Sequence, residues 1–206
     1  GDASGAPDEP TVSEASAQAD HKKGSSHICA GSIVSIVAGI CDDHKQDVLD
    51  STLFAQFAAS GQYDRDSQMY QWYTAYVTTL QILGWNTKGF PFQKYVQLPP
   101  SFRLDSQVLA LTAKAWPANA QSALSAAIRT LSGYKSSDRR IQVLGQSSVT
   151  ASASNFQLGA VVESKDDQVT MQTMAIIFDS QGISGDFLFQ SYSAASTTLF
   201  AGAQTM

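Results

Sequence analysis

Three stretches near the end of the chain contain no Asp, Glu, Lys or Arg: Ile141–Val162 (IQVLGQSSVTASASNFQLGAVV), Gln168–Phe178 (QVTMQTMAIIF) and Phe187–Met206 (FLFQSYSAASTTLFAGAQTM). The charges between them lie in two turn-like segments, residues 163–167 and 179–186. Apolar residues alternate with Ser, Thr and Gln along these stretches. This pattern predicts strands at about residues 140–150, 155–163, 168–179, 186–193 and 197–204. Because the linkers are short, we expect these strands to pair antiparallel in a C-terminal β-meander.

The polar side of these strands carries neutral Ser, Thr and Gln instead of charge. A sheet with one face in water normally places Lys and Glu on that face, because solvated charge keeps sheets from sticking together. We therefore infer that both faces meet something other than bulk water. The sequence leaves three covers open: the protein's own helices, a second copy of the chain, or a membrane.

Helical spacing of apolar residues precedes the strands. The first predicted helix runs from Asp47 to Gly61, and the second carries an aromatic stripe from Met69 to Leu83. A second helical pair is expected at residues 105–116 and 117–133, where Pro117 suits the start of a helix. The run Ile28–Ile40 is predicted to be a buried strand or a buried helix.

The predicted fold is therefore α+β, with two helical hairpins packed on the C-terminal meander and the element order α-α-β-α-α-β-β-β-β-β. The strand between the helical pairs is expected within Trp85–Leu98, at an edge because Pro91 lies inside it. Residues 1–26 are rich in Gly, Ala, Ser, Pro and acidic residues, so we expect a disordered tail there. Residues 27–206 are expected to form a single domain.

The ends of the chain carry two further expectations. The chain begins with Gly1 instead of Met, and the first residues lack the pattern of a secretory signal. This is typical of a processed chain and leaves open secretion by a route without a visible signal peptide. Residues 202–206 still read as strand, so we expect the natural chain to continue beyond Met206.

The composition argues against a nucleic-acid partner. Charged residues make up 15% of the 206 residues, against roughly 25% in typical soluble domains. The net charge is −5 and the isoelectric point is near 5.0, whereas nucleic-acid binding normally requires a basic face. The basic pairs Lys22-Lys23 and Arg139-Arg140 are too small to make one.

Metal binding is the first chemistry to weigh. His27, Cys29, Cys41 and His44 are residue types that zinc prefers. The segment Ser32–Ile40 between them is apolar, however, whereas zinc sites of this kind use polar turns. We therefore favour buried structural thiols over a metal centre. A disulfide between the two cysteines and lipid attachment to one of them remain open.

No set of residues predicts catalysis. The three histidines lie within the first 44 residues, and the chain has no G-x-S-x-G motif for a nucleophilic serine. The pairs Asp42-Asp43 and Asp166-Asp167 are adjacent, so in a strand their side chains would point to opposite faces. Phosphate-binding glycine motifs are absent from the sequence. We therefore predict no catalytic, cofactor-binding or metal-binding residue.

Aromatic residues are the remaining candidates for binding. Eight of them lie between Tyr70 and Tyr95. Most are expected in the core, but exposed rings can contact a ligand or a bilayer interface. The predicted contact residues are Tyr70, Trp85, Phe90, Phe92 and Tyr192.

Several short motifs resemble a set of bacterial and fungal proteins of similar length that have no assigned function. They comprise Ser51–Ala58, Tyr63-Asp64-Arg65, Trp72-Tyr73, Leu83-Gly84-Trp85, Phe90 with Phe92 and Tyr95, Asn155–Gly159 and Gly202–Thr205. The predicted element order alone is similar to that of the Cyt-type cytolysins, which include the mushroom volvatoxins. That resemblance implies helix pairs wrapped around a sheet that engages membranes.

We therefore expect a non-enzymatic, toxin-like protein that binds membranes and forms homo-oligomers through its uncharged Ser/Thr-rich sheet. Two alternatives are an enzyme whose site is dispersed in sequence, of hydrolase type, and a structural self-assembly module.

Overall fold

The computed structural model describes residues 24–95, 97–150 and 153–206. Within these residues the chain forms five α-helices and eight strands, which confirms the predicted α+β class. The helices are α1 (Asp42–Ser60), α2 (Met69–Ile82), α3 (Leu104–Ala115), α4 (Ala118–Ser132) and α5 (Arg139–Ser148), with 3₁₀ turns η1 (Phe187–Phe189) and η2 (Ala194–Ser196). The strands are β1 (Ser25–Cys29), β2 (Ser32–Ile36), β3 (Gln93–Tyr95), β4 (Ser101–Arg103), β5 (Ala153–Lys165), β6 (Gln168–Asp179), β7 (Ser191–Ser193) and β8 (Thr198–Thr205).

Six strands form one central sheet in the order β1-β2-β5-β6-β8-β3, and β4 pairs with β7 in a separate ribbon. β5, β6 and β8 are antiparallel neighbours, as the meander predicts. The sheet as a whole is nevertheless mixed, because β2 lies parallel to β5, with Ser32 opposite Gln157 and Ile36 opposite Val161. Parallel neighbours need a long crossover connection, and all five helices lie between these two strands in the sequence.

The N-terminal part of the sheet is missing from the predicted element order. The run Ile28–Ile40 holds most of a β-hairpin, in which β1 and β2 pair on either side of Ala30-Gly31. Ser25 and Ser26 already belong to β1, so the boundary predicted for the tail 1–26 is wrong. Residues 1–23 of that tail lie outside the described residues.

The segment 140–150, predicted to be a strand, is the helix α5. The carboxylate of Asp138 accepts a hydrogen bond from the Arg140 backbone N–H at 2.9 Å and caps the start of this helix. The buried residues Ile141, Leu144, Gly145 and Ser148 recur at helical spacing. The Ser and Gln residues between them give an alternation of apolar and polar residues that is typical of a strand. For this reason the predicted strand is wrong.

Two other predicted strands are much shorter than expected. Residues 186–193 hold η1 and the three-residue β7, because this segment folds inward and pairs with β4 instead of joining the central sheet. Among the described residues of the run 85–98, which exclude residue 96, only Gln93–Tyr95 is strand. It lies at the edge of the sheet next to β8, in agreement with the effect expected of Pro91.

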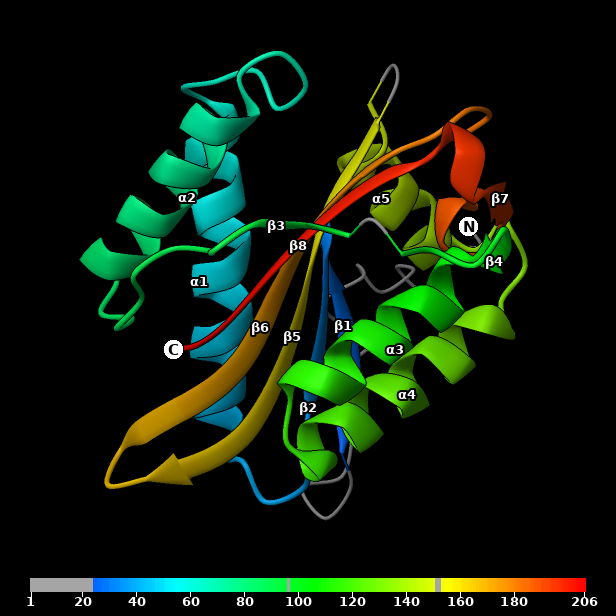
Figure 1. Cartoon of the computed structure of the whole chain (residues 1–206). Helices are drawn as coiled ribbons and strands as arrows, with labels where there is room; N and C mark the ends of the chain where they lie inside the picture. The colour runs from blue at the N-terminus through cyan, green and yellow to red at the C-terminus, as the bar shows by residue number, and fades with distance from the viewer. Residues whose placement is uncertain (1–23, 96, 151–152) are drawn as a thin grey trace, which may run out of the picture.

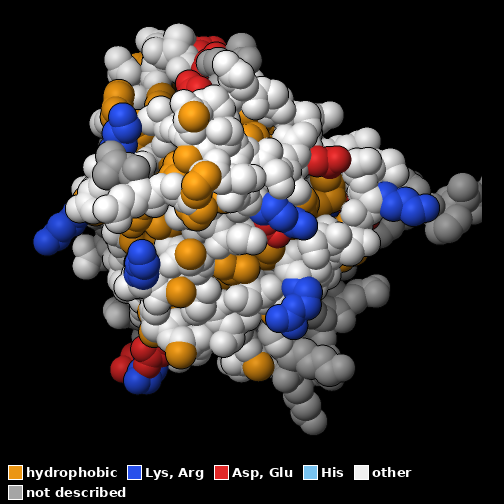
Figure 2. Space-filling model, turned by 45° about the vertical axis from the view of Figure 1, so that its right-hand side comes forward, with side chains coloured by type: hydrophobic (Ala, Val, Ile, Leu, Met, Phe, Trp, Pro, Cys, Tyr) orange, Lys and Arg blue, Asp and Glu red, His pale blue; other side chains and the backbone are white. Residues whose placement is uncertain are grey.

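The α1–α2 hairpin covers one face of the sheet, and α3 and α4 cover the other (Figure 1). Residues 154–161 of β5 and 173–178 of β6 are buried without interruption, so both faces of these strands are enclosed. Water is thus kept away from the central parts of β5 and β6 by the protein's own helices, whereas residues 162–170 at the end of the β5–β6 hairpin and several residues of β8 are partly or fully exposed. On the face in Figure 2 the charged side chains are few and scattered.

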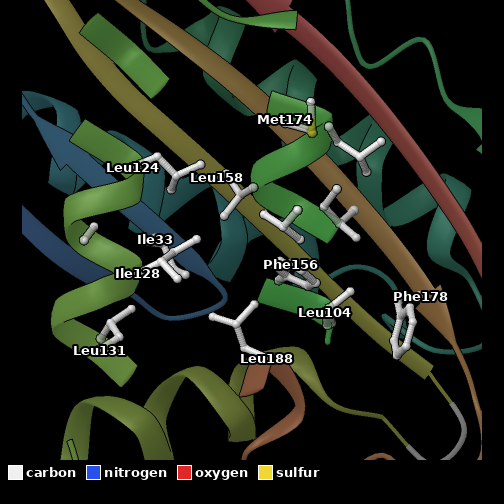
Figure 3. Packing of buried hydrophobic residues seen from close by; sticks show 14 of the residues in the cluster. Ile33, Leu104, Leu124, Ile128, Leu131, Phe156, Leu158, Met174, Phe178 and Leu188 are labelled. Carbon is white, nitrogen blue, oxygen red and sulfur yellow. The ribbon is translucent and has the colours of Figure 1, made fainter. Parts of the chain in front are cut away.

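The layer between the sheet and the α3–α4 hairpin is almost entirely apolar. Phe156 and Leu158 of β5 and Met174 of β6 pack against Leu124 and Ile128 of α4 (Figure 3). This close packing of large aliphatic and aromatic side chains anchors α3 and α4 firmly. The opposite layer has a different character, and it contains the candidate site.

Candidate functional site

Helix α1 buries Val48 and Leu49 but exposes two of its largest apolar side chains. Phe54 and Phe57 are 58% and 61% exposed, whereas Ala55 and Ala59 are fully buried. The face of α1 toward the sheet carries small and polar residues, including Thr52 and Gln56. The small residues permit close packing, and the arrangement leaves two phenylalanine rings in contact with water.

The exposed large hydrophobic residues of the described chain gather on the α1–α2 hairpin and its end. They are Phe54, Phe57, Tyr70, Ile82 and Leu83. We call Phe54, Phe57, Ile82 and Leu83 the outer patch. Phe54 and Leu83 line the same recess. Phe57 lies about one helical turn after Phe54, and Ile82 directly precedes Leu83. Exposed large apolar groups concentrated on one element are typical of an interaction surface.

The same hairpin is acidic. Residues 42–83 contain six aspartates but only two basic residues, Lys45 and Arg65. The recess beside the outer patch, of about 990 Å³, is bordered by Asp47, Asp50 and Asp167. A partner of this surface must therefore tolerate apolar side chains surrounded by negative charge.

Beneath the hairpin lies a chain of buried amide and hydroxyl groups, which we call the polar seam: Gln56, Ser32, Gln157, Asn155 and Tyr73. Gln56 of α1 accepts a hydrogen bond from the Gly31 N–H at 2.9 Å and donates to the Cys29 carbonyl at 2.8 Å. Gln56 also donates to Ser32 Oγ, which in turn donates to Gln157 Oε1 at 2.9 Å. The seam thus begins on α1 and crosses β2 to β5.

The seam ends on α2. Gln157 Nε2 donates to Tyr73 Oη at 2.9 Å, and Tyr73 Oη donates to Asn155 Oδ1. Burial raises the pKa of the Tyr73 phenol, which keeps it neutral and able to donate. Alongside the buried apolar contacts of the hairpin, each of these neutral hydrogen bonds contributes little net free energy, because water can replace its partners once the hairpin separates.

Replacing Gln56 with alanine is expected to lower the free energy of unfolding by about 2 kcal/mol, because the Gly31 N–H and the Cys29 carbonyl would lose buried partners. Urea unfolding followed by circular dichroism measures this change. The matched control is Gln46→Ala on the same helix, where Gln46 is exposed and bonds only to Asp50. Equal stability of the two variants would show that the seam contributes nothing to holding α1.

The structure brings three of the five predicted contact residues together. Tyr70, Phe90 and Phe92 line a groove between α2, residues 86–92 and the end of β8, with a volume of about 750 Å³. Trp85 lines the neighbouring acidic recess instead, and its Nε1 donates to Ser51 Oγ at 2.9 Å. A contact role for these four residues remains a prediction.

Tyr192 does not belong to any such surface. Its side chain is 5% exposed and packs edge-on against Phe178 at 4.7 Å between ring centroids. Its hydroxyl donates to the Phe187 carbonyl at 2.8 Å. The choice of Tyr192 as a contact residue is therefore wrong: the inward fold of residues 186–193 makes it a core residue.

The cysteines and histidines are placed apart from any converging site. Both thiols are free, with Cys29 buried and Cys41 exposed, and burial raises the pKa of Cys29 to about 12. His44 Nδ1 lies 2.6 Å from Ser164 Oγ, which links the first turn of α1 to β5. Within residues 24–95, 97–150 and 153–206, no group of three or more His, Cys, Asp or Glu could hold a metal ion.

Comparisons with known proteins supply no further assignment. No protein family, curated protein or solved structure matches this chain. In the part of the chain that the structure describes, no helix has both the length and the apolar character needed to cross a membrane. The site must therefore be interpreted from its own geometry.

Sequence reasoning missed the outer patch and the polar seam. Leu49, Leu53, Phe54 and Phe57 fall at helical spacing and indicate the first helix, but this spacing does not tell which of them are exposed. The available signal was the second stripe on the same helix, formed by Ala55, Ala59 and Gln56. Only the partner surface decides which of two such stripes is buried.

Proposed function

We propose that this protein is a non-enzymatic membrane-binding protein of toxin-like type, and that the α1–α2 hairpin makes the first contact with lipid. The observation that carries this proposal is the outer patch, with Phe54, Phe57 and Ile82 at 58%, 61% and 79% exposure. Transferring such side chains from water into the interface of a bilayer is favourable by roughly 1.5–3 kcal/mol for each ring that is fully buried.

The charge of the hairpin selects the kind of membrane. Its six aspartates would be repelled by anionic headgroups, whereas zwitterionic headgroups leave only the apolar contribution. We therefore propose that the protein prefers neutral phospholipids such as phosphatidylcholine.

The polar seam supports a second stage, self-association through the sheet. Helices cover both faces of the central part of the sheet, so a second copy can pack against this part only after a hairpin has left. Of the two helical layers, the one held through Gln56, Gln157 and Tyr73 is the more polar and the easier to hydrate.

The test is flotation of the protein with vesicles of pure phosphatidylcholine and with vesicles containing phosphatidylglycerol, combined with release of an entrapped dye. We expect binding to the neutral vesicles and weaker binding to the anionic ones. Binding to the anionic vesicles should increase with salt concentration, because salt screens the repulsion. Absence of flotation with both vesicle types at micromolar protein would refute the proposal. Stronger binding to anionic vesicles at low salt would refute the charge argument.

A further inference from the structure

The groove between α2 and the end of β8 has features that the proposed membrane contact does not use. One wall is α2, with Tyr70 and Thr78, and the opposite wall is the segment 86–92, which we call the strap. Gln204 and Thr205 of β8 contribute as well. Its volume of about 750 Å³ lies within the usual range for small-molecule sites.

The strap is fixed in place, so the groove is formed before any ligand arrives. Thr87 Oγ1 donates to Gln204 Oε1 at 2.7 Å, and Gln81 Nε2 donates to the Thr87 carbonyl at 2.6 Å. A Cβ on Gly202 would lie 3.1 Å from Phe90 Cβ, so the glycine permits the strap to lie directly on β8. A preformed site loses little conformational entropy on binding.

The lining combines aromatic rings with neutral polar groups that have hydrogen-bonding capacity to spare. The ring of Tyr70 is 66% exposed. The side chains of Thr78 and Asn86 line the groove and are exposed to solvent. Gln204 Nε2 is buried without a hydrogen-bond partner in the described chain. Among the lining residues Lys88 is the only charged one.

These properties narrow the class of ligand. A cation would find no carboxylate in the lining, and a polyanion would find one lysine. A lipid tail would bury Thr78, Asn86 and Gln204 without giving them partners, which is costly. A pyranose ring has an apolar C–H face that packs on an aromatic ring and hydroxyl groups that donate to and accept from amides and threonine. We propose that this groove binds a neutral oligosaccharide.

The experiment is isothermal titration, supported by saturation-transfer NMR, with a panel of neutral tri- and tetrasaccharides of glucose, galactose, mannose and N-acetylglucosamine. We expect saturable binding of at least one member at submillimolar to millimolar concentration. Tyr70→Ala is expected to weaken it about tenfold through loss of the stacking ring, and Asn86→Ala to weaken it through loss of an amide partner. Both side chains are exposed, so the variants should fold, which circular dichroism verifies.

Phe57→Ala is the matched control, because it removes a similarly exposed ring on the other helix of the hairpin that does not line the groove. It should leave sugar binding unchanged while weakening vesicle binding, and Tyr70→Ala should do the reverse. This pairing separates a failure of the groove proposal from a failure of the membrane proposal. Absence of binding by every panel member at millimolar concentration would overturn the assignment, as would binding that neither Tyr70→Ala nor Asn86→Ala affects.

Discussion

Replacing Phe54 and Phe57 together with serine is expected to reduce the affinity for phosphatidylcholine vesicles by on the order of 100-fold. Each ring that leaves water contributes roughly 1.5–3 kcal/mol when fully buried, and 1.4 kcal/mol corresponds to a factor of ten. Because only 58% and 61% of these side chains is exposed in the free protein, the part that is already buried gains nothing on transfer, and we take the lower end of this range. Flotation over a series of lipid concentrations measures the effect.

The double variant should retain the stability of the parent protein. The two side chains make few contacts that folding depends on, and serine is tolerated on the exposed face of a helix at small cost. Tyr70→Ser is the matched control, since Tyr70 is equally exposed on the same hairpin but faces the groove. If the double variant binds vesicles as tightly as the parent does, lipid contact through the outer patch is refuted.

Lowering the pH from 7.5 to 4 is expected to cost the folded protein about 3 kcal/mol through His27 alone. Burial, together with the smaller effect of the positive charge of Lys45, lowers the pKa of His27 to about 4. The side chain is 6% exposed on β1, its Nε2 lies 2.9 Å from Ser25 Oγ, and its Nδ1 has no partner in the described chain.

The direction of this change in the free energy of unfolding depends on which state binds the proton. In the unfolded chain His27 has its ordinary pKa of about 6.5, so between that value and about 4 the unfolded state binds the proton and the folded state does not. The contribution of neutral His27 to the free energy of unfolding is therefore fully present above the pKa of the unfolded state. It declines as the pH falls through this window and is lost below about 4. At 1.36 kcal/mol per pKa unit the total is about 3 kcal/mol.

The measurement compares urea unfolding of the parent and of His27→Gln at pH 7.5, 6, 5 and 4. Carboxylates that protonate in acid affect both proteins equally, so the difference between the two curves isolates His27. We expect this difference to shift in favour of the glutamine variant by about 3 kcal/mol from pH 7.5 to pH 4. A difference that stays constant with pH would show that His27 is not held neutral by burial. Lys45 of α1, whose positive charge helps to lower the pKa of His27, forms an ion pair with Asp42, with 3.7 Å between Nζ and Oδ1.

The pH response also bears on the proposed membrane step. His27 and Cys29 lie on the side of β1 that faces α1, so protonation of His27 would place charge under the α1–α2 hairpin. The loss of stability would then fall on the layer that holds the polar seam. Dye release that rises as the pH approaches 4 would agree with this order of events.

The sequence by itself determined the class of the fold and most of its elements. The alternation of apolar and neutral polar residues in β5, β6 and β8, and the aromatic stripe of α2, are local periodic patterns, and each reports a single element. The absence of charge along the strands also predicted enclosure on both faces, which holds for residues 154–161 of β5 and 173–178 of β6. These features depend only on neighbours along the chain.

The tertiary structure decided what covers the sheet and what remains on the surface. The parallel pairing of β2 with β5 joins residues more than a hundred positions apart, and no local pattern encodes it. α5 presents Ile141 and Leu144 among serines and glutamines, a pattern that fits strand and helix equally until packing selects one. α1 has two usable stripes, and the close approach needed over Gly31 selected the one with Ala55 and Gln56, which left Phe54 and Phe57 exposed. Long-range packing places residues by the shape and polarity of their partner surface, which a single sequence does not contain.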